Sequence, residues 1–265
     1  VITAANTFVA TVGGICELGA KPVFVDVLEN YCMDADLIEA KITKKTKAIL
    51  PVHFTGYTPN MSKIMSLSKK YKIPVIEDAC QGILSSFNKK NSGTWGITGC
   101  FSLHPLKNLN VWSDGGVITT NNKKIYNRLR LLRNNGLINR DEFIITGYNS
   151  RLDTMQAAFL LEKLAIFPNE VELRQKIAKR YDEAFKGIVK VVVIAEGHTS
   201  VYAQYTIEVD NRDEFLAKMK HDGIPTAVHY PIPIHHQPIF KELGYTNIEM
   251  PLADRASQRV VSLPM

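Results

Sequence analysis

Cysteine is scarce in this sequence, and its spacing excludes several kinds of site. Four cysteines, Cys16, Cys32, Cys80 and Cys100, are spread over 265 residues, and no two of them form a CxxC pair. This spacing argues against a zinc ribbon or a dithiol redox motif, and all four lie in or near apolar stretches. We therefore expect buried free thiols in a reducing compartment, which predicts a cytoplasmic protein.

Long apolar runs are also missing. No stretch approaches the roughly 18 consecutive apolar residues that a membrane-spanning helix requires. We predict no membrane partner. The chain opens without methionine, in VITAANTFVAT, and stops at VVSLPM, so we expect it to be most of a longer protein.

An arginine-rich stripe interleaved with aromatic residues is absent, although the net charge is +6. Much of the lysine lies in short polar runs, such as TKKTK at 43–47 and NNKK at 121–124. Such runs are typical of solvated surface, and we predict no nucleic-acid partner. A small anionic substrate stays compatible with this charge.

Short apolar runs rich in β-branched residues alternate with helical patterns in the first part of the chain. Runs of this kind are typical of strands covered on both faces, and their alternation with helices predicts a mostly parallel, doubly wound α/β sheet. The predicted strands are 21–27, 47–54, 73–80, 99–104 and 115–120, and the predicted helices are 61–71 and 122–135. Asn60 or Ser62 can cap the first of these helices.

A second region begins near residue 151. Asp153 is placed to cap a helix over 151–164, with Gln156 at capping-box spacing, and Pro168 is predicted to end that helix. Further patterns predict a helix at 169–185, a strand at 201–209, a helix at 213–223 and a strand at 226–230. We therefore expect a large domain over 1–168 and a smaller α+β domain over 169–265.

Polar side chains follow three of the predicted strands at the ends where open α/β sheets bind ligands. Asp78 and Gln81 close VIEDACQ, Ser102 and Lys107 close CFSLHPLK, and His53 closes ILPVHF. Each alone is most simply a cap or a turn residue. Their joint placement is what points to a site.

This combination meets the needs of pyridoxal phosphate (PLP). That cofactor requires an amine for a Schiff base and a carboxylate to keep its ring nitrogen protonated. Lys107 offers the amine, Asp78 the carboxylate and Ser102 a hydroxyl, and Phe8 is a candidate stacking face. Trp112 and Phe101 are expected in the core.

The sequence resembles the DegT/DnrJ/EryC1/StrS family of PLP-dependent nucleotide-sugar aminotransferases. The matching segments, in order, are NTFVATVGGICELGAKPVFVDV, VIEDACQG, GCFSLHPLKNLNVWSDGGVITT, LRNNGL with GYNSRLDTMQAAFL, and VHYPIPIHHQP. The resemblance implies PLP fold type I, as in aspartate aminotransferase: a large domain with a mostly parallel mixed sheet and a smaller C-terminal α+β domain.

By this resemblance, Lys107 forms the Schiff base with PLP and also carries protons during the reaction. Asp78 pairs with the pyridine nitrogen, Gln81 approaches the ring hydroxyl and Ser102 binds the phosphate. Phe8 stacks on the ring. The family's phosphate-binding turn is expected before residue 1.

The resemblance also implies a homodimer with shared active sites. Asn149 in GYNSR would reach the cofactor phosphate of the neighbouring subunit, and Arg151 would meet an anionic part of the substrate. His229 and Tyr230 would line the sugar site. From the residues alone, Asn149 can equally end a turn, Arg151 can form a structural ion pair, and His229 can be a core histidine.

The implied reaction transfers an amino group, from glutamate as in much of the family, to a nucleotide-linked ketosugar. The HPLKNL and VHYPIPIHHQP segments favour amination at C-3 over C-4. An NAD-dependent Rossmann oxidoreductase or epimerase is an alternative, since glycines precede a strand ending in Asp26, but GxGxxG is missing. A dehydratase of the same fold would replace Lys107 by histidine, and a non-catalytic sensor is a third class. Adjacent residues His235 and His236 would point apart on a helix or strand, so we expect no metal site.

Overall fold

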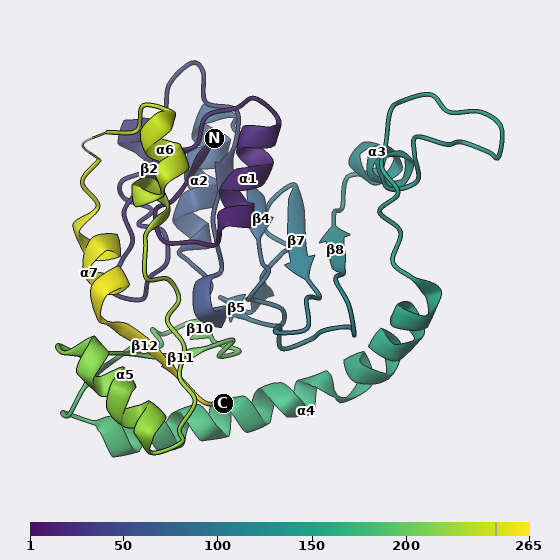
Figure 1. Cartoon of the computed structure of the whole chain (residues 1–265). Helices are drawn as coiled ribbons and strands as arrows, with labels where there is room; N and C mark the ends of the chain where they lie inside the picture. The colour runs from purple at the N-terminus through teal and green to yellow at the C-terminus, as the bar shows by residue number, and fades with distance from the viewer. Residues whose placement is uncertain (247) are drawn as a thin grey trace.

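The computed structural model describes residues 1–246 and 248–265. Its centre is a layer of strands in the order β2-β1-β3, continued by β4-β7-β8 (Figure 1). Two isolated parallel bridges, Ile49 to Val75 and Val52 to Asp78, join these halves. The strands of this layer are β1 (Ile2–Ala4), β2 (Val23–Val25), β3 (Ile49–Leu50), β4 (Ile76–Asp78), β7 (Thr98–Ser102) and β8 (Gly116–Thr119).

The layer is a mixed sheet, as the sequence predicts. β1 pairs in parallel with β2 and β3, β4 pairs in parallel with β7, and β8 runs antiparallel to β7. The carboxyl ends of β4 and β7 therefore lie side by side. Asp78 and Ser102, the last residues of these strands, are brought to one edge of the sheet.

Helices α1 (Val9–Glu17) and α2 (Met61–Tyr71) pack on the first strands (Figure 1). Their buried residues Val12, Ile64 and Leu67 share one apolar core with β1 and β2. As predicted, Asn60 caps α2, because its side chain accepts a hydrogen bond from the backbone N–H of Lys63.

The C-terminal segment returns to this same core. It contains η3 (Ile234–His236), α6 (Pro238–Glu242) and α7 (Pro251–Arg259), and it contributes Ile234, Phe240 and Ala253 to the cluster around β1 and β2. Residues distant in sequence thus cover one side of the sheet. The predicted domain boundary between 168 and 169 stays a prediction.

A separate antiparallel sheet has the strand order β12-β11-β9, with α5 (Arg212–His221) beside it. Its strands are β9 (Lys190–Val191), β11 (Tyr205–Glu208) and β12 (Val260–Leu263). β11 is shorter than the strand expected at 201–209, and the segment expected as a strand at 226–230 forms only one bridge, Ala227 to Ser262. A third small sheet has the order β10-β5-β6, with β5 (Ser86–Phe87), β6 (Lys90–Asn91) and β10 (His198–Thr199).

Pro168 does not end a helix, contrary to the sequence prediction. α4 (Thr154–Phe185) runs through it, from the α3 (Lys123–Arg133) side of the molecule to the β11–β12 side (Figure 1). A proline inside a helix costs about 3 kcal/mol. Burial on both sides of Pro168 offsets this cost: Phe167 and Val171 pack in a cluster with Leu103, and Ala178 packs against β11 and β12.

The start of α4 follows its predicted cap only in part. Asp153 accepts hydrogen bonds from the backbone N–H groups of Met155 and Gln156. The capping box does not close, because the Gln156 side chain instead accepts from the backbone N–H of Trp112 at 2.8 Å. Trp112 itself is 72% exposed and contacts the Phe159 ring at a tilt, so its predicted place in the core is wrong.

Candidate active site

A cavity of about 740 Å³ opens beyond the carboxyl ends of β4 and β7. A site at this edge agrees with the general rule for open α/β sheets. Among the residues that line the cavity are seven predicted from the sequence: Phe8, Asp78, Gln81, Ser102, Lys107, His229 and Tyr230.

The carboxylate of Asp78 is held in a fixed orientation. Its Oδ2 accepts a hydrogen bond from the Thr11 hydroxyl at 2.6 Å, and its Oδ1 accepts one from the Cys80 backbone N–H at 3.2 Å. The Thr11 hydroxyl is in turn 2.7 Å from that of Thr7. α1 thus positions the acid that ends β4. Sequence reasoning missed Thr11, which lies in a helix with no motif of its own.

Lys107 follows β7 in a tight turn. Its backbone N–H donates to the His104 carbonyl at 2.9 Å, and its own carbonyl accepts from Asn110 Nδ2 at 2.7 Å. Among the described residues, neither Lys107 nor Asp78 forms an ion pair. The cavity therefore offers the amine of Lys107 and the carboxylate of Asp78, both available to a ligand.

The pKa values of nearby groups respond to both charges. Burial, and then the positive charge of Lys107, lower the pKa of His229. Burial, and then the negative charge of Asp78, raise the pKa of Tyr230 to about 12. At neutral pH, His229 and Tyr230 are therefore both uncharged. The pKa of Cys80 is raised mainly by burial and then by the charge of Asp78, while the charge of Lys107 lowers it.

The rest of the cavity lining includes aromatic and polar side chains. The Phe8 ring is 52% exposed and lies 5.8 Å from the Tyr230 ring, between centroids. The Gln81 side chain is fixed in position, because its Oε1 accepts a hydrogen bond from the Thr55 backbone N–H at 2.6 Å. His229 Nδ1 lies 3.0 Å from the Ser262 hydroxyl. The Phe8 ring and the polar side chains of Gln81 and His229 therefore all face the same cavity.

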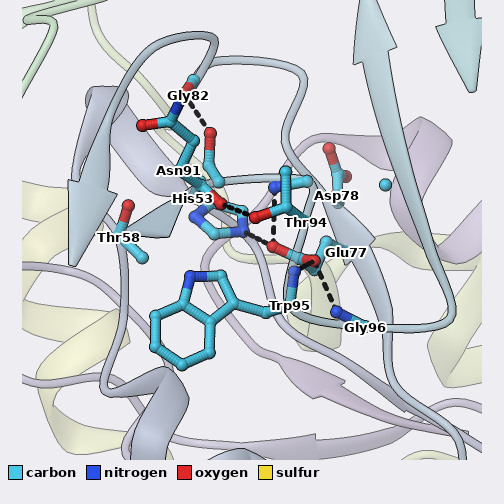
Figure 2. A network of polar contacts seen from close by, with 12 residues as sticks. His53, Thr58, Glu77, Asp78, Gly82, Asn91, Thr94, Trp95 and Gly96 are labelled. Atoms are coloured by element: carbon cyan, nitrogen blue, oxygen red, sulfur yellow. Dashed lines mark hydrogen bonds and ion pairs between the residues drawn. The ribbon is translucent and has the colours of Figure 1, made fainter. Parts of the chain in front are cut away.

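A buried polar network supports β4 from the side away from the cavity (Figure 2). Glu77 is fully buried, and its two oxygens accept backbone hydrogen bonds from Gly93, Trp95 and Gly96 at 2.6–2.7 Å. His53 Nε2 lies 3.0 Å from Glu77 Oε2. These hydrogen bonds to the charged form lower the pKa of Glu77, although burial opposes them. The network fixes the strand that carries Asp78, and His53 belongs to it rather than to the cavity lining.

Asn149 and Arg151 lie outside this cavity. They belong to the segment between α3 and α4, which extends away from the sheets (Figure 1). Asn149 forms a β-bridge with Asn134, and Arg151 Nη1 donates to the Asn134 side chain at 2.5 Å. Both residues are exposed, and neither one lines the cavity of its own chain.

Arg174 on α4 lines the cavity and was missed by sequence reasoning. Nothing in NEVELRQKIAKRYDEAF distinguishes it from its neighbouring charges. Its Nη1 donates to the Tyr202 carbonyl at 3.1 Å, and burial lowers its pKa. No salt bridge occupies its guanidinium within the described part of the chain, so the group can receive an anion.

The model of the DegT/DnrJ/EryC1/StrS aminotransferase family matches residues 1–265. The chain belongs to this family. The cavity with Lys107 and Asp78 therefore belongs to a protein of an aminotransferase family. The resemblance found in the sequence is confirmed.

Two relatives at similar identity bear different kinds of name. The chain is 43% identical to a UDP-2-acetamido-2-deoxy-3-oxo-D-glucuronate aminotransferase of Pseudomonas aeruginosa, over all of this chain and 74% of that protein. It is 42% identical to a pleiotropic regulatory protein of Geobacillus stearothermophilus, over all of this chain and 73% of that protein.

The fold matches solved aminotransferases over its whole length. The structure of DesV from S. venezuelae in complex with a ketimine intermediate superposes with a TM-score of 0.96 at 31% identity, covering 100% of this chain and 72% of that one. Other solved relatives hold PLP or pyridoxamine phosphate. The fold is that of the PLP-dependent enzymes of this family.

Within the described residues, no helix has both the length and the hydropathy needed to cross a membrane. All four cysteines are free.

Proposed function

We propose that this chain is a PLP-dependent aminotransferase that transfers an amino group from glutamate to C-3 of a nucleotide-linked ketosugar. The observation that carries this proposal is the placement of Lys107 and Asp78 in one cavity, each without an ion-pair partner among the described residues. Relatives named for 3-oxo or 3-amino sugars linked to UDP or dTDP support the substrate class and the position.

The residues of the cavity fit PLP. The donor set comprises an amine, an anchored carboxylate, a hydroxyl and an exposed ring face, from Lys107, Asp78, Ser102 and Phe8. When bound, PLP supplies an electron sink that weakens the bond to hydrogen at the carbon bearing the amino group. Asp78, fixed by Thr11, keeps a proton on the ring nitrogen.

Lys107 has two tasks in this proposal. Its Nζ attaches the cofactor, and once displaced by the amino donor it removes a proton from one carbon and returns it to another. An amine can do this only while uncharged. Lys107 lines the cavity, so its amine lies where a bound cofactor and substrate would be.

We also propose a homodimer in which the segment between α3 and α4 completes the partner's site. Asn149 and Arg151 do not reach the cavity of their own chain. Large apolar side chains on that segment and at the start of α4 are exposed, among them Phe143 at 67%, Tyr148 at 68% and Met155 at 79%. An exposed set of this kind is typical of an interface between subunits.

Mixed dimers test this arrangement. In heterodimers of Lys107→Ala and Asn149→Ala chains, one of the two sites has both residues intact, so about half of the activity lost in each homodimer returns. If mixing restores nothing, Asn149 acts within its own chain.

The finer domain layout belongs to the same proposal. We assign the PLP-binding domain to 1–168 and the smaller domain to 169–265, supported by the separate apolar cluster between β11, β12 and α5. The free thiols support a cytoplasmic location.

Replacing Lys107 tests the function directly. Lys107→Ala should fold, retain its far-UV spectrum, and lose both the borohydride-sensitive visible absorbance with PLP and the conversion of glutamate to 2-oxoglutarate. Lys218→Ala, at an exposed lysine of α5, is the matched control and should keep both. Full turnover by Lys107→Ala would contradict the assignment.

A regulatory role without catalysis is the second candidate, favoured by the name of the 42% identical relative. The two roles separate in a single experiment. A catalytic chain loaded with PLP forms pyridoxamine phosphate when glutamate is added, and then transfers the amine to a panel of dTDP-, UDP- and GDP-linked ketosugars. A sensor leaves the cofactor unchanged.

A further inference from the structure

Two histidines and an aspartate meet where η3 passes the start of α7. The Nε2 atoms of His235 and His236 lie 3.1 and 2.9 Å from the same oxygen, Oδ1 of Asp254. The His235 side chain is fully buried, whereas Asp254 and His236 are 31% and 53% exposed. The cluster therefore has one buried side and one side open to solvent.

The backbone here removes the objection that adjacent histidines point apart. η3 is a single 3-10 turn, and it sets the two imidazole rings 4.1 Å apart, between centroids, facing one carboxylate. The position of Asp254 is also fixed, because Asp26 accepts the backbone N–H groups of Leu252 and Ala253 at 2.9 Å and anchors the first turn of α7.

The two nitrogen-to-oxygen separations are close to those of a zinc coordination sphere. Bonds of about 2.0–2.1 Å in a tetrahedral site put neighbouring ligand atoms about 3.3 Å apart. Here the two nitrogen-to-oxygen separations are 3.1 and 2.9 Å, and all three atoms lie within 4.8 Å of one another. An ion among them needs only small side-chain shifts, and a water on the exposed side can complete the fourth position.

We propose that His235, His236 and Asp254 bind one divalent transition-metal ion, with Zn²⁺ the best match. Two imidazole nitrogens and one carboxylate oxygen favour Zn²⁺, Co²⁺ or Ni²⁺ over Mg²⁺ and Ca²⁺, which prefer all-oxygen sites.

The surroundings of His235 limit the affinity. Its Nδ1 is buried and has no hydrogen-bond partner among the described residues. Metal-bound histidines usually donate this second N–H, and a ligand without such a partner binds more weakly. The site is therefore expected to have a micromolar dissociation constant, weaker than a closed structural zinc site.

A metal here would join two segments that also form the cavity wall. His235 lies shortly after Tyr230, and α7, which carries Asp254, leads directly into β12 with Ser262. Tyr230 and Ser262 both line the cavity. The ion would act as a clamp that stabilises this wall, independently of whether the chain is an aminotransferase.

Equilibrium dialysis of the chelator-treated full chain against zinc, with bound metal counted by mass spectrometry, tests the site. The wild-type chain should bind one zinc, and zinc should raise its melting temperature. His236→Gln, which changes an exposed side chain, and Asp254→Asn should each weaken binding at least tenfold and remove the thermal shift.

His221→Ala is the matched control, since His221 is an exposed histidine on α5 outside the cluster. This variant should bind zinc as the wild type does. Two outcomes overturn the proposal: no zinc bound with a dissociation constant below about 100 μM, or binding that His236→Gln leaves unchanged.

Discussion

Thr11→Val isolates the hydrogen bond that orients Asp78, the proposed partner of the cofactor's ring nitrogen. The substitution keeps the shape of the side chain and removes the hydroxyl that donates to Asp78 Oδ2 at 2.6 Å. A hydrogen bond to a charged group contributes about 1.5–3 kcal/mol. Because Asp78 is only partly buried and water can replace part of the lost donor, the lower end applies.

A loss of about 1.5 kcal/mol corresponds to roughly tenfold in an equilibrium or rate constant. We therefore expect about tenfold weaker PLP binding, tenfold slower single-turnover reaction with glutamate, or a division of this factor between the two. Fluorescence titration with PLP and stopped-flow absorbance measure them separately.

Thr3→Val is the matched control for this experiment. Thr3 is fully buried on β1, and its hydroxyl donates to the Leu50 carbonyl at 2.9 Å, away from the cavity lining. Both variants should lose about 1 kcal/mol of unfolding free energy, while only Thr11→Val changes the chemistry. If Thr11→Val binds PLP and reacts with glutamate at wild-type rates, Asp78 does not depend on this contact.

Two further substitutions test the buried Glu77 network that supports β4 and the Arg174 guanidinium that lines the cavity. Glu77→Gln should cost about 3 kcal/mol of unfolding free energy in urea, because it breaks a buried charged network. The folded pKa of Glu77 lies below its ordinary 4.5, so its contribution is full above that pH and falls as pH drops through the folded value. Glu77→Gln should flatten this acid decline, whereas Glu172→Gln, at an exposed glutamate of α4, should not. Arg174→Met should raise KM about tenfold for whichever substrate places an anion there, with kcat kept, as loss of a hydrogen-bonded charge predicts. Measuring KM for glutamate and for the nucleotide sugar identifies that substrate. Arg180→Met, on the same helix, is the control. Unchanged KM values for both substrates would contradict the proposed role of Arg174.

The main features of the candidate site were predictable from short stretches of sequence. Asp78 and Lys107 each follow an apolar strand, and parallel pairing of β4 with β7 brings such strand ends together. Asn60 and Asp153 were recognised as caps because a cap depends on only a few adjacent residues. The mostly parallel pairing of the sheet and the position of the cavity at its strand ends followed from the same local patterns.

Other features depended on contacts between distant segments. α4 continues through Pro168 because burial of residues on both sides offsets the cost of a proline inside a helix. The sequence prediction considered only that local cost. Arg174 reaches the cavity only because α4 passes beneath both sheets, and nothing in its own stretch signals this.

By itself, the sequence determined the strands that carry Asp78 and Ser102 and the pair of charges at the sheet edge, since these depend on neighbouring residues and on parallel pairing. Only the tertiary structure decided that Thr11 orients Asp78 and that His235, His236 and Asp254 converge. Each of these arrangements joins residues that no local periodicity relates, so the packing of whole elements had to bring them within bonding distance.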